Sequence, residues 1–148
     1  VNFQQSAGLV CYYNAHKYHY LYVSVDEKGR RFVDIMSCQA DATCEATFLL
    51  SEARGDSATD DIGIELPQQG AVWLRCEVQY SELVFSWSLD GQQWQKIPVT
   101  LYYSIVSDEA GKGESASFTG AFVGMCCQDV SGTDLAADFD YFHYKETE

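Results

Sequence analysis

Apolar and polar residues alternate along most of the chain with a period of two, the repeat of a β-strand that has one buried and one solvated face. The clearest run covers residues 72–79, where the core-facing positions are Val72, Leu74, Cys76 and Val78. No window of helical length carries an apolar stripe with the 3.6-residue repeat of a helix. We therefore expect nearly all of the secondary structure to be strand.

The same alternation predicts how the strands are connected. Residues 83–89 continue the pattern, and the Asp-Gly pair at 90–91 then tolerates the positive φ angles of a hairpin turn before a third strand that contains Ile97. The sequence thus predicts a three-stranded meander. The other predicted strands cover residues 9–14, 17–26, 31–38, 47–50, 119–128 and 136–144.

Two stretches rich in Gly, Ser, Asp and Glu, residues 51–61 and 107–117, are expected to be surface loops. Many short strands, with no helices to cover a parallel sheet, indicate an all-β fold, namely an antiparallel β-sandwich of the jelly-roll kind. Because the sequence shows no internal repeat and no linker, we expect residues 1–148 to form a single domain.

The charge of the chain limits the kinds of partner that it can bind, and its cysteines indicate the cellular compartment. The 148 residues include 9 Lys and Arg against 22 Asp and Glu, a formal net charge of -13. Such a chain repels a nucleic-acid backbone and an anionic bilayer, so we expect no nucleic acid and no membrane as a partner. The six cysteines fall largely in apolar runs, and neighbours such as Cys126 and Cys127 rarely bridge each other. We expect buried, reduced thiols and therefore a cytoplasmic, bacterial protein.

Two predicted strands carry aromatic residues on the face opposite their core residues. These residues are Tyr18, Tyr20 and Tyr22 on the strand at 17–26, and Phe142 and Tyr144 on the strand at 136–144. A solvated face rarely carries so many rings. The rings form either a sugar-stacking platform, or an interface with another domain or subunit, or a set of cross-strand contacts on an outer face.

Carboxylate pairs raise the question of catalysis, because a glycosidase needs an acid and a base across the bond that it breaks. The pairs at 60–61 and 108–109 lie in polar loops, where solvated acids are ordinary. Asp138 and Asp140, on one predicted strand, are a weak signal for a structural calcium ion. The three histidines have no companions that would form a catalytic triad. We expect no catalytic residue in this chain, no cofactor and no metal beyond that calcium.

Four strings of residues, taken in order, resemble one family. They are AGLVCYYN at 7–14, SWSLDGQQW at 86–94, SDE at 107–109 with FTGAFVG at 118–124, and ADFDYF at 137–142. Together they resemble the C-terminal concanavalin A-like β-sandwich of glycoside hydrolase family 43 β-xylosidases, from about residue 4 to residue 145. The stretch at 51–61 departs from the family as an insertion. Because the family's sandwich begins before the position that matches Val1, the resemblance also implies an N-terminally truncated excerpt of a larger glycosidase, with one sheet edge exposed.

The resemblance implies an accessory domain. In such enzymes a separate five-bladed propeller carries the acid and base, and it releases xylose from the non-reducing end of xylo-oligosaccharides. The sandwich packs on the propeller, the enzyme is a homo-oligomer, and a loop at the position of Phe118 closes the glycone pocket. From the residues alone, Phe118 is either a pocket aromatic after a Gly- and Ser-containing loop or a core anchor of the next strand. An independent carbohydrate-binding or protein-docking sandwich is the alternative function.

Overall fold

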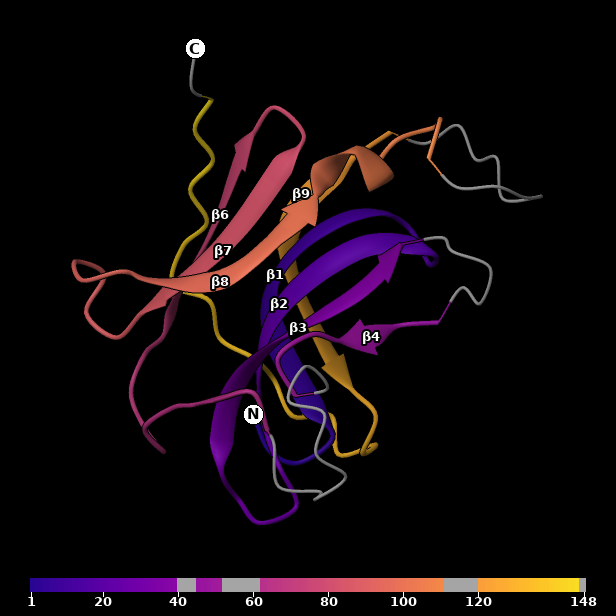
Figure 1. Cartoon of the computed structure of the whole chain (residues 1–148). Helices are drawn as coiled ribbons and strands as arrows, with labels where there is room; N and C mark the ends of the chain where they lie inside the picture. Colours follow the sequence, from indigo (N-terminus) through magenta and orange to yellow (C-terminus); the bar gives the residue numbers. More distant parts are fainter. Residues whose placement is uncertain (40–44, 52–61, 111–119, 147–148) are drawn as a thin grey trace.

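A computed structural model describes residues 1–39, 45–51, 62–110 and 120–146 of the chain (Figure 1). Strands dominate these residues, and they are joined by turns and one short 3₁₀ helix. The elements are β1 (Gln5–Asn14), β2 (Lys17–Val25), β3 (Arg31–Gln39), β4 (Thr47–Phe48), β5 (Ile64–Glu65), β6 (Trp73–Gln79), β7 (Glu82–Ser88), β8 (Gln95–Tyr102), η1 (Tyr103–Ile105) and β9 (Phe122–Asp129). Over the described part of the chain, no helix has the length and apolar character needed to cross a membrane.

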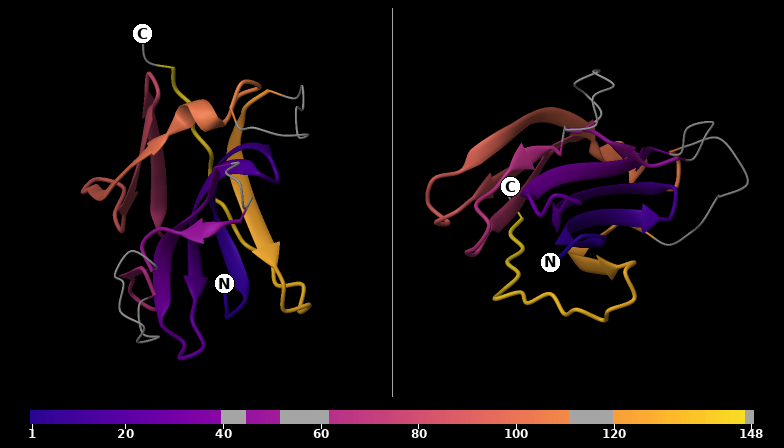
Figure 2. Two further views of the ribbon diagram at one scale, coloured as in Figure 1. Left: turned by 45° about the vertical axis from the view of Figure 1, so that its right-hand side comes forward. Right: turned by 90° about the horizontal axis from the view of Figure 1, so that it is seen from below.

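The strands form two sheets that face each other (Figure 2). The six-stranded sheet has the order β4-β3-β2-β1-β9, with β5 also paired to β3, and the three-stranded sheet has the order β6-β7-β8. All pairings between these strands are antiparallel. The predicted all-β antiparallel sandwich is confirmed, and so is the meander that begins at residue 72.

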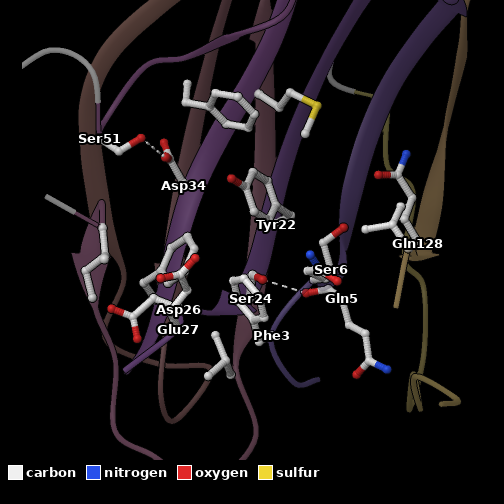
Figure 3. Close-up of a pocket in the computed structure, with 17 residues that line it drawn as sticks. Phe3, Gln5, Ser6, Tyr22, Ser24, Asp26, Glu27, Asp34, Ser51 and Gln128 are labelled. Carbon is white, nitrogen blue, oxygen red and sulfur yellow. Dashed lines mark hydrogen bonds between the residues drawn. The ribbon is translucent and has the colours of Figure 1, made fainter. Parts of the chain in front are cut away.

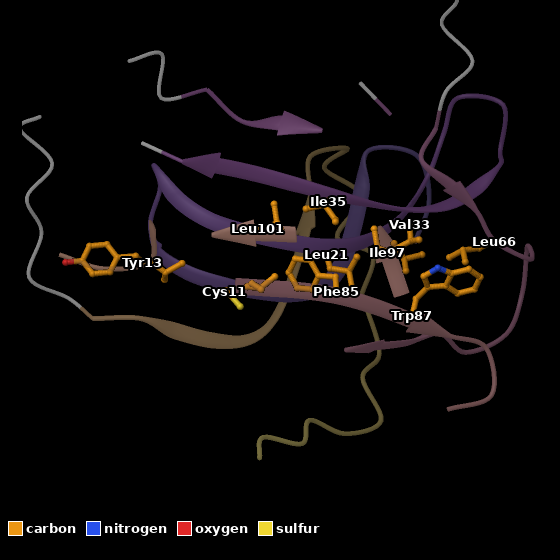
Figure 4. Packing of buried hydrophobic residues seen from close by; sticks show 13 residues of the cluster. Cys11, Tyr13, Leu21, Val33, Ile35, Leu66, Phe85, Trp87, Ile97 and Leu101 are labelled. Atoms are coloured by element: carbon orange, nitrogen blue, oxygen red, sulfur yellow. The ribbon is translucent and has the colours of Figure 1, made fainter. Parts of the chain in front are cut away.

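The core lies between the sheets and is built by the inward positions of the alternating strands (Figure 4). Leu21 on β2 and Ile35 on β3 face Leu83 and Phe85 on β7, and all four side chains are fully buried. Burial of one such side chain contributes about 1.5–3 kcal/mol to the free energy of unfolding. Leu83 and Phe85 are apolar positions of the alternating pattern that the sequence predicts for residues 83–89.

The prediction of a strand at residues 136–144 is wrong. In the structure these residues form no strand, and they run as an extended segment from the end of β9 towards the side of β6 (yellow in Figure 1). The segment lines the opening between β1 and β6, and its aromatic residues stay largely exposed. Large rings occupy both of its alternating faces, so the pattern of the sequence does not define one buried face for a sheet to cover.

The expectation that all of the cysteines are buried is wrong for Cys127, which is exposed on β9. Cys11 and Cys38 are buried, whereas Cys76 and Cys126 are half-buried, and all five are in the reduced thiol form. Cys127 is exposed because the six-stranded sheet is wider than the three-stranded sheet that faces it. Strand β9 is the outermost strand of the wider sheet, and apolar residues on both of its faces remain exposed. Cys44 lies outside the described residues, as do residues 52–61 of the predicted loop at 51–61 and residues 111–117 of the other.

Two glycines in neighbouring strands test how closely β1 and β2 must approach. A Cβ atom added at Gly8 on β1 would lie 1.9 Å from the carbonyl oxygen of Leu21, whereas one added at Gly124 on β9 would have no atom within 4 Å. We expect Gly8→Ala to lower the free energy of unfolding by roughly 3 kcal/mol, because backbone must move to relieve the clash. Gly124→Ala should change it by about 0.5 kcal/mol or less. Urea denaturation of both variants measures the difference, and equal stabilities would contradict the close approach.

Candidate functional site

Phe118, the residue that the resemblance assigns to the glycone pocket, lies outside the described residues. The structure does describe the segment that leads towards it, from the end of β8 through η1 to Ala110. This segment is held by buried polar side chains of the six-stranded sheet. We call Tyr13, Lys17, His19 and Ser37 the anchor cluster.

Lys17 and Tyr13 hold the end of that segment. The Lys17 ammonium donates a hydrogen bond to the carbonyl oxygen of Ser107 at 2.9 Å, and the Tyr13 hydroxyl donates one to the carboxylate of Asp108. The ammonium also lies 4.8 Å from the centre of the Tyr13 ring, within the range of a cation–π contact. Both side chains are only 2% exposed, so their polar groups have exchanged water for these partners.

His19 holds the start of the segment. Its Nε2 lies 3.0 Å from the carbonyl oxygen of Tyr102, and its Nδ1 lies 2.8 Å from the hydroxyl oxygen of Ser37. Because a carbonyl oxygen only accepts, Nε2 carries the proton, and Nδ1 accepts from the Ser37 hydroxyl. Burial of the ring lowers the pKa of His19, and the Tyr102 carbonyl opposes that change only in part. The imidazole is therefore neutral, and it ties β2 to the end of β8.

The anchor cluster holds the backbone of residues 102–108 in position. Three of its side chains point from the β1–β2 hairpin towards the segment of residues 102–108, and each makes a polar bond to it. Leaving a buried ammonium or imidazole without its partner costs more than the bond itself contributes, so the cluster holds this segment in one place. Across the described ranges, no group of three or more His, Cys, Asp and Glu side chains is placed to hold a metal ion. Asp138 and Asp140 are exposed, and the calcium site there stays a prediction.

The anchor cluster was missed at the level of sequence, although a signal for it was present. Lys17 and His19 occupy the same alternating positions as Leu21 and Val23, the core face of β2. Polar residues at core-facing positions need partners inside the protein. The sequence could therefore have shown that Lys17 and His19 point inward and donate hydrogen bonds. It could not have shown which carbonyl groups accept these bonds.

The predicted tyrosine stripe lies on the outer face of the six-stranded sheet, away from the anchor cluster. Tyr20 and Tyr22 are buried and Tyr18 is half-buried. The rings of Tyr20 and Tyr22 stack with centroids 5.3 Å apart, and the Tyr20 hydroxyl donates to the carbonyl oxygen of Cys126 at 3.0 Å. Burial raises the pKa of the Tyr20 phenol, so it stays protonated. The stripe thus fixes β2 against its neighbours, and its role as an interface or sugar platform stays a prediction.

A groove of about 520 Å³ runs over this outer face (Figure 3). Tyr22 lies in its floor, and Asp34 is its one fully buried carboxylate. The Asp34 carboxylate accepts bonds from the Ser51 hydroxyl at 2.7 Å and from the backbone N–H groups of Leu50 and Ile35 at 3.0 and 2.6 Å. Burial raises the pKa of Asp34, and these donors oppose the rise. Since its oxygens are already occupied, Asp34 holds residues 50–51 in place.

Phe142 and Tyr144, the other predicted aromatic pair, lie elsewhere. They belong to the C-terminal segment, are 42% and 60% exposed, and line the opening between the two sheets. The tyrosine stripe lies on the opposite side of the six-stranded sheet, where Tyr22 lines the groove, so the structure does not bring the two sets together.

The two facing antiparallel sheets, with a polar cluster inside one end, define the class of the protein as an all-β, lectin-like sandwich. More particularly, the chain belongs to the family described as "Beta xylosidase C-terminal Concanavalin A-like domain", whose model matches residues 1–145. The predicted concanavalin A-like fold is thereby confirmed, and so is the resemblance to the C-terminal domain of these β-xylosidases.

Similar proteins are much longer than this chain. The chain is 39% identical over 143 residues to Xylosidase/arabinosidase 43B of Humicola insolens, which is 96% of the chain and 25% of that protein. It is 36% identical over 146 residues to Beta-xylosidase of Bacillus subtilis (strain 168), 98% of the chain and 25% of that protein. The crystal structure of a xylan beta-1,4-xylosidase from Bacillus halodurans C-125 matches 90% of this chain and 23% of its own, with a TM-score of 0.73 and 28% identity. The chain thus spans about a quarter of the length of these relatives.

The neutral His19 makes stability depend on pH. An unfolded histidine has a pKa of about 6.5, and the pKa of His19 is lower in the fold, so the unfolded chain binds more protons in the interval between the two values. The contribution of His19 is complete above about pH 6.5 and is lost as the pH falls from there to the lower pKa of the folded state.

We expect the melting temperature to fall by a few degrees from pH 7 to pH 5, and His19→Gln to remove most of that dependence. His143→Gln, at an exposed position, is the matched control and should leave the dependence unchanged. Thermal unfolding followed by circular dichroism at a series of pH values measures it. A His19→Gln profile parallel to that of the unchanged chain would contradict the neutral, buried imidazole.

Proposed function

We propose that this chain is the C-terminal accessory domain of a β-xylosidase, and that the same polypeptide carries a catalytic propeller domain on which it packs. Two observations support the proposal. The family match covers residues 1–145, and the relatives that the chain resembles are about four times its length. The substrate proposed for the whole enzyme is a xylo-oligosaccharide, cleaved from its non-reducing end.

The role proposed for this domain is to close the glycone pocket of the catalytic domain with Phe118. The observation that carries this step is the anchor cluster, which holds the segment of residues 102–108 on the way to Phe118. A core stabilised by apolar burial alone needs no lysine or histidine in its interior. Three buried polar side chains directed at one connecting segment indicate that the position of that segment matters.

The chemistry of the reaction is proposed to lie outside this chain. An inverting glycosidase needs two carboxyl groups about 6.5–9.5 Å apart across the bond. The buried carboxylate of the described residues, Asp34, is occupied by three donors. We therefore expect the 148-residue chain by itself to hydrolyse no aryl-xyloside, and we propose the cytoplasm as the place of the enzyme.

Contact surfaces for the propeller or for a second subunit are proposed on the open side of the sandwich. Phe142 and Tyr144 are exposed there together with Val123 and Met125 of β9. Exposed apolar groups that gather on one side of a domain commonly mark an interface. These residues support a homo-oligomer or a domain contact, and the groove on the other face supports neither in particular.

The test of the pocket role is Phe118→Ala in the full-length enzyme. If the ring forms a wall of the glycone pocket, its loss loosens the substrate, and kcat/KM should fall by roughly 10- to 100-fold while the melting temperature stays near that of the unchanged enzyme. Tyr80→Ala is the matched control, because Tyr80 is an aromatic residue that is 94% exposed. It should leave both quantities unchanged.

The core-anchor role predicts the opposite pattern for the same variant. Removing a buried phenylalanine costs about 3–5 kcal/mol of unfolding free energy, whereas the activity of each folded molecule would remain normal. Steady-state kinetics and thermal unfolding on one preparation separate the two roles. Unchanged kcat/KM in a folded Phe118→Ala enzyme would overturn the pocket assignment.

A further inference from the structure

Two thiols from opposite sheets face each other inside the sandwich. Cys11 lies on β1 and Cys76 on β6, and their Sγ atoms are 3.6 Å apart although the residues are separated by 65 positions. Cys11 belongs to the buried core cluster, as Figure 4 shows, and Cys76 packs against that cluster. A disulfide bond is about 2.05 Å long, so the two sulfur atoms need to approach by roughly 1.5 Å to form one.

The surroundings of the pair favour reaction at Cys11. Either thiol can donate its hydrogen to the other sulfur. When Cys11 ionises, the Cys76 thiol can donate to the Cys11 thiolate, and this contact lowers the pKa of Cys11 in spite of the burial of the side chain. The same contact and burial raise the pKa of Cys76, so Cys76 keeps its proton. A thiolate, and not a thiol, is the form of cysteine that attacks an oxidant.

A small oxidant has a path to the pair. Cys11 and Cys76 both line the opening between β1 and β6, a cavity of about 950 Å³ that the C-terminal segment borders. Cys76 is half-buried, on a strand at the edge of its sheet. A molecule of the size of hydrogen peroxide fits such an opening, whereas a protein oxidant does not.

We propose that Cys11 and Cys76 form a peroxide-sensitive pair that closes to a disulfide and covalently joins the two sheets. In the first step the Cys11 thiolate attacks one oxygen of hydrogen peroxide, the O–O bond breaks, and hydroxide leaves with a sulfenic acid on Cys11. In the second step the Cys76 sulfur attacks the Cys11 sulfur, the S–O bond breaks, and water leaves. Two thiols and one peroxide thus give one disulfide and two waters.

The disulfide would join the two sheets at the opening between β1 and β6. Among the described residues no strand pairing joins the two sheets, and a covalent bond at the opening between β1 and β6 fixes their separation there. A crosslink between positions this far apart in sequence also restricts the unfolded chain strongly. The proposal concerns the sandwich itself and does not depend on the proposed function.

The test treats the 148-residue chain with a slight excess of hydrogen peroxide. We expect the intact mass to fall by two hydrogens, a peptide containing Cys11 joined to a peptide containing Cys76 under non-reducing digestion, and a rise in melting temperature on the order of 10 °C that dithiothreitol reverses. These measurements on the unchanged chain need no variant to fold.

Variants identify the pair. Cys76→Ser and, as a second replacement in case the first fails to fold, Cys76→Ala should abolish the linked peptide and the rise in melting temperature. The double variant Cys126→Ser, Cys127→Ser is the matched control, because it removes two neighbouring thiols of β9 and should keep both effects. A linked peptide with a different partner, or oxidation of Cys11 to a sulfinic acid without any link to Cys76, would overturn the proposal.

Discussion

Strand β2 is buried on both faces, and the two faces make different kinds of contact. On the inner face Leu21 and Val23 belong to the apolar core, while on the outer face Tyr20 and Tyr22 stack against each other. The pairing of β2 with β1 on one side and β3 on the other is therefore fixed, because a shift by one residue would exchange the two faces. The remaining strands, and the segments between them, are placed relative to this strand.

The inner face of β2 changes from apolar to polar towards its beginning, and that change links the fold to the site. Leu21 and Val23 lie over the core, whereas Lys17 and His19, on the same face, reach the backbone of residues 102–108. A neutral imidazole and a buried ammonium are costly inside a protein unless each is bonded. Their partners are carbonyl groups of one connecting segment, so the polar half of β2 stabilises the fold only when that segment is in place. The stability of the sandwich therefore depends on the position of residues 102–108, the segment that leads towards Phe118.

Much of this organisation could be predicted from the sequence where one face of a strand is plainly apolar. The meander of β6, β7 and β8 follows from the alternation of apolar and polar residues together with the Asp-Gly turn at 90–91. The C-terminal segment could not be predicted in this way, because rings such as Phe139 and Phe142 occupy both alternating faces. The exposure of Cys127 and the contact between Cys11 and Cys76 depend on the widths and the relative position of the two sheets. These properties depend on packing between distant parts of the chain, and the alternation within a single strand does not report on them.

We propose that this sandwich completes an active site located on another domain of the same enzyme. The most direct measurement is aryl-xyloside hydrolysis by three samples: this chain alone, the enzyme from which it has been deleted, and a mixture of the two. We predict no hydrolysis by the chain alone, a loss of at least about 10-fold in kcat/KM on deletion, and partial recovery in the mixture. Full activity of the deleted enzyme, or hydrolysis by the chain alone, would contradict the account.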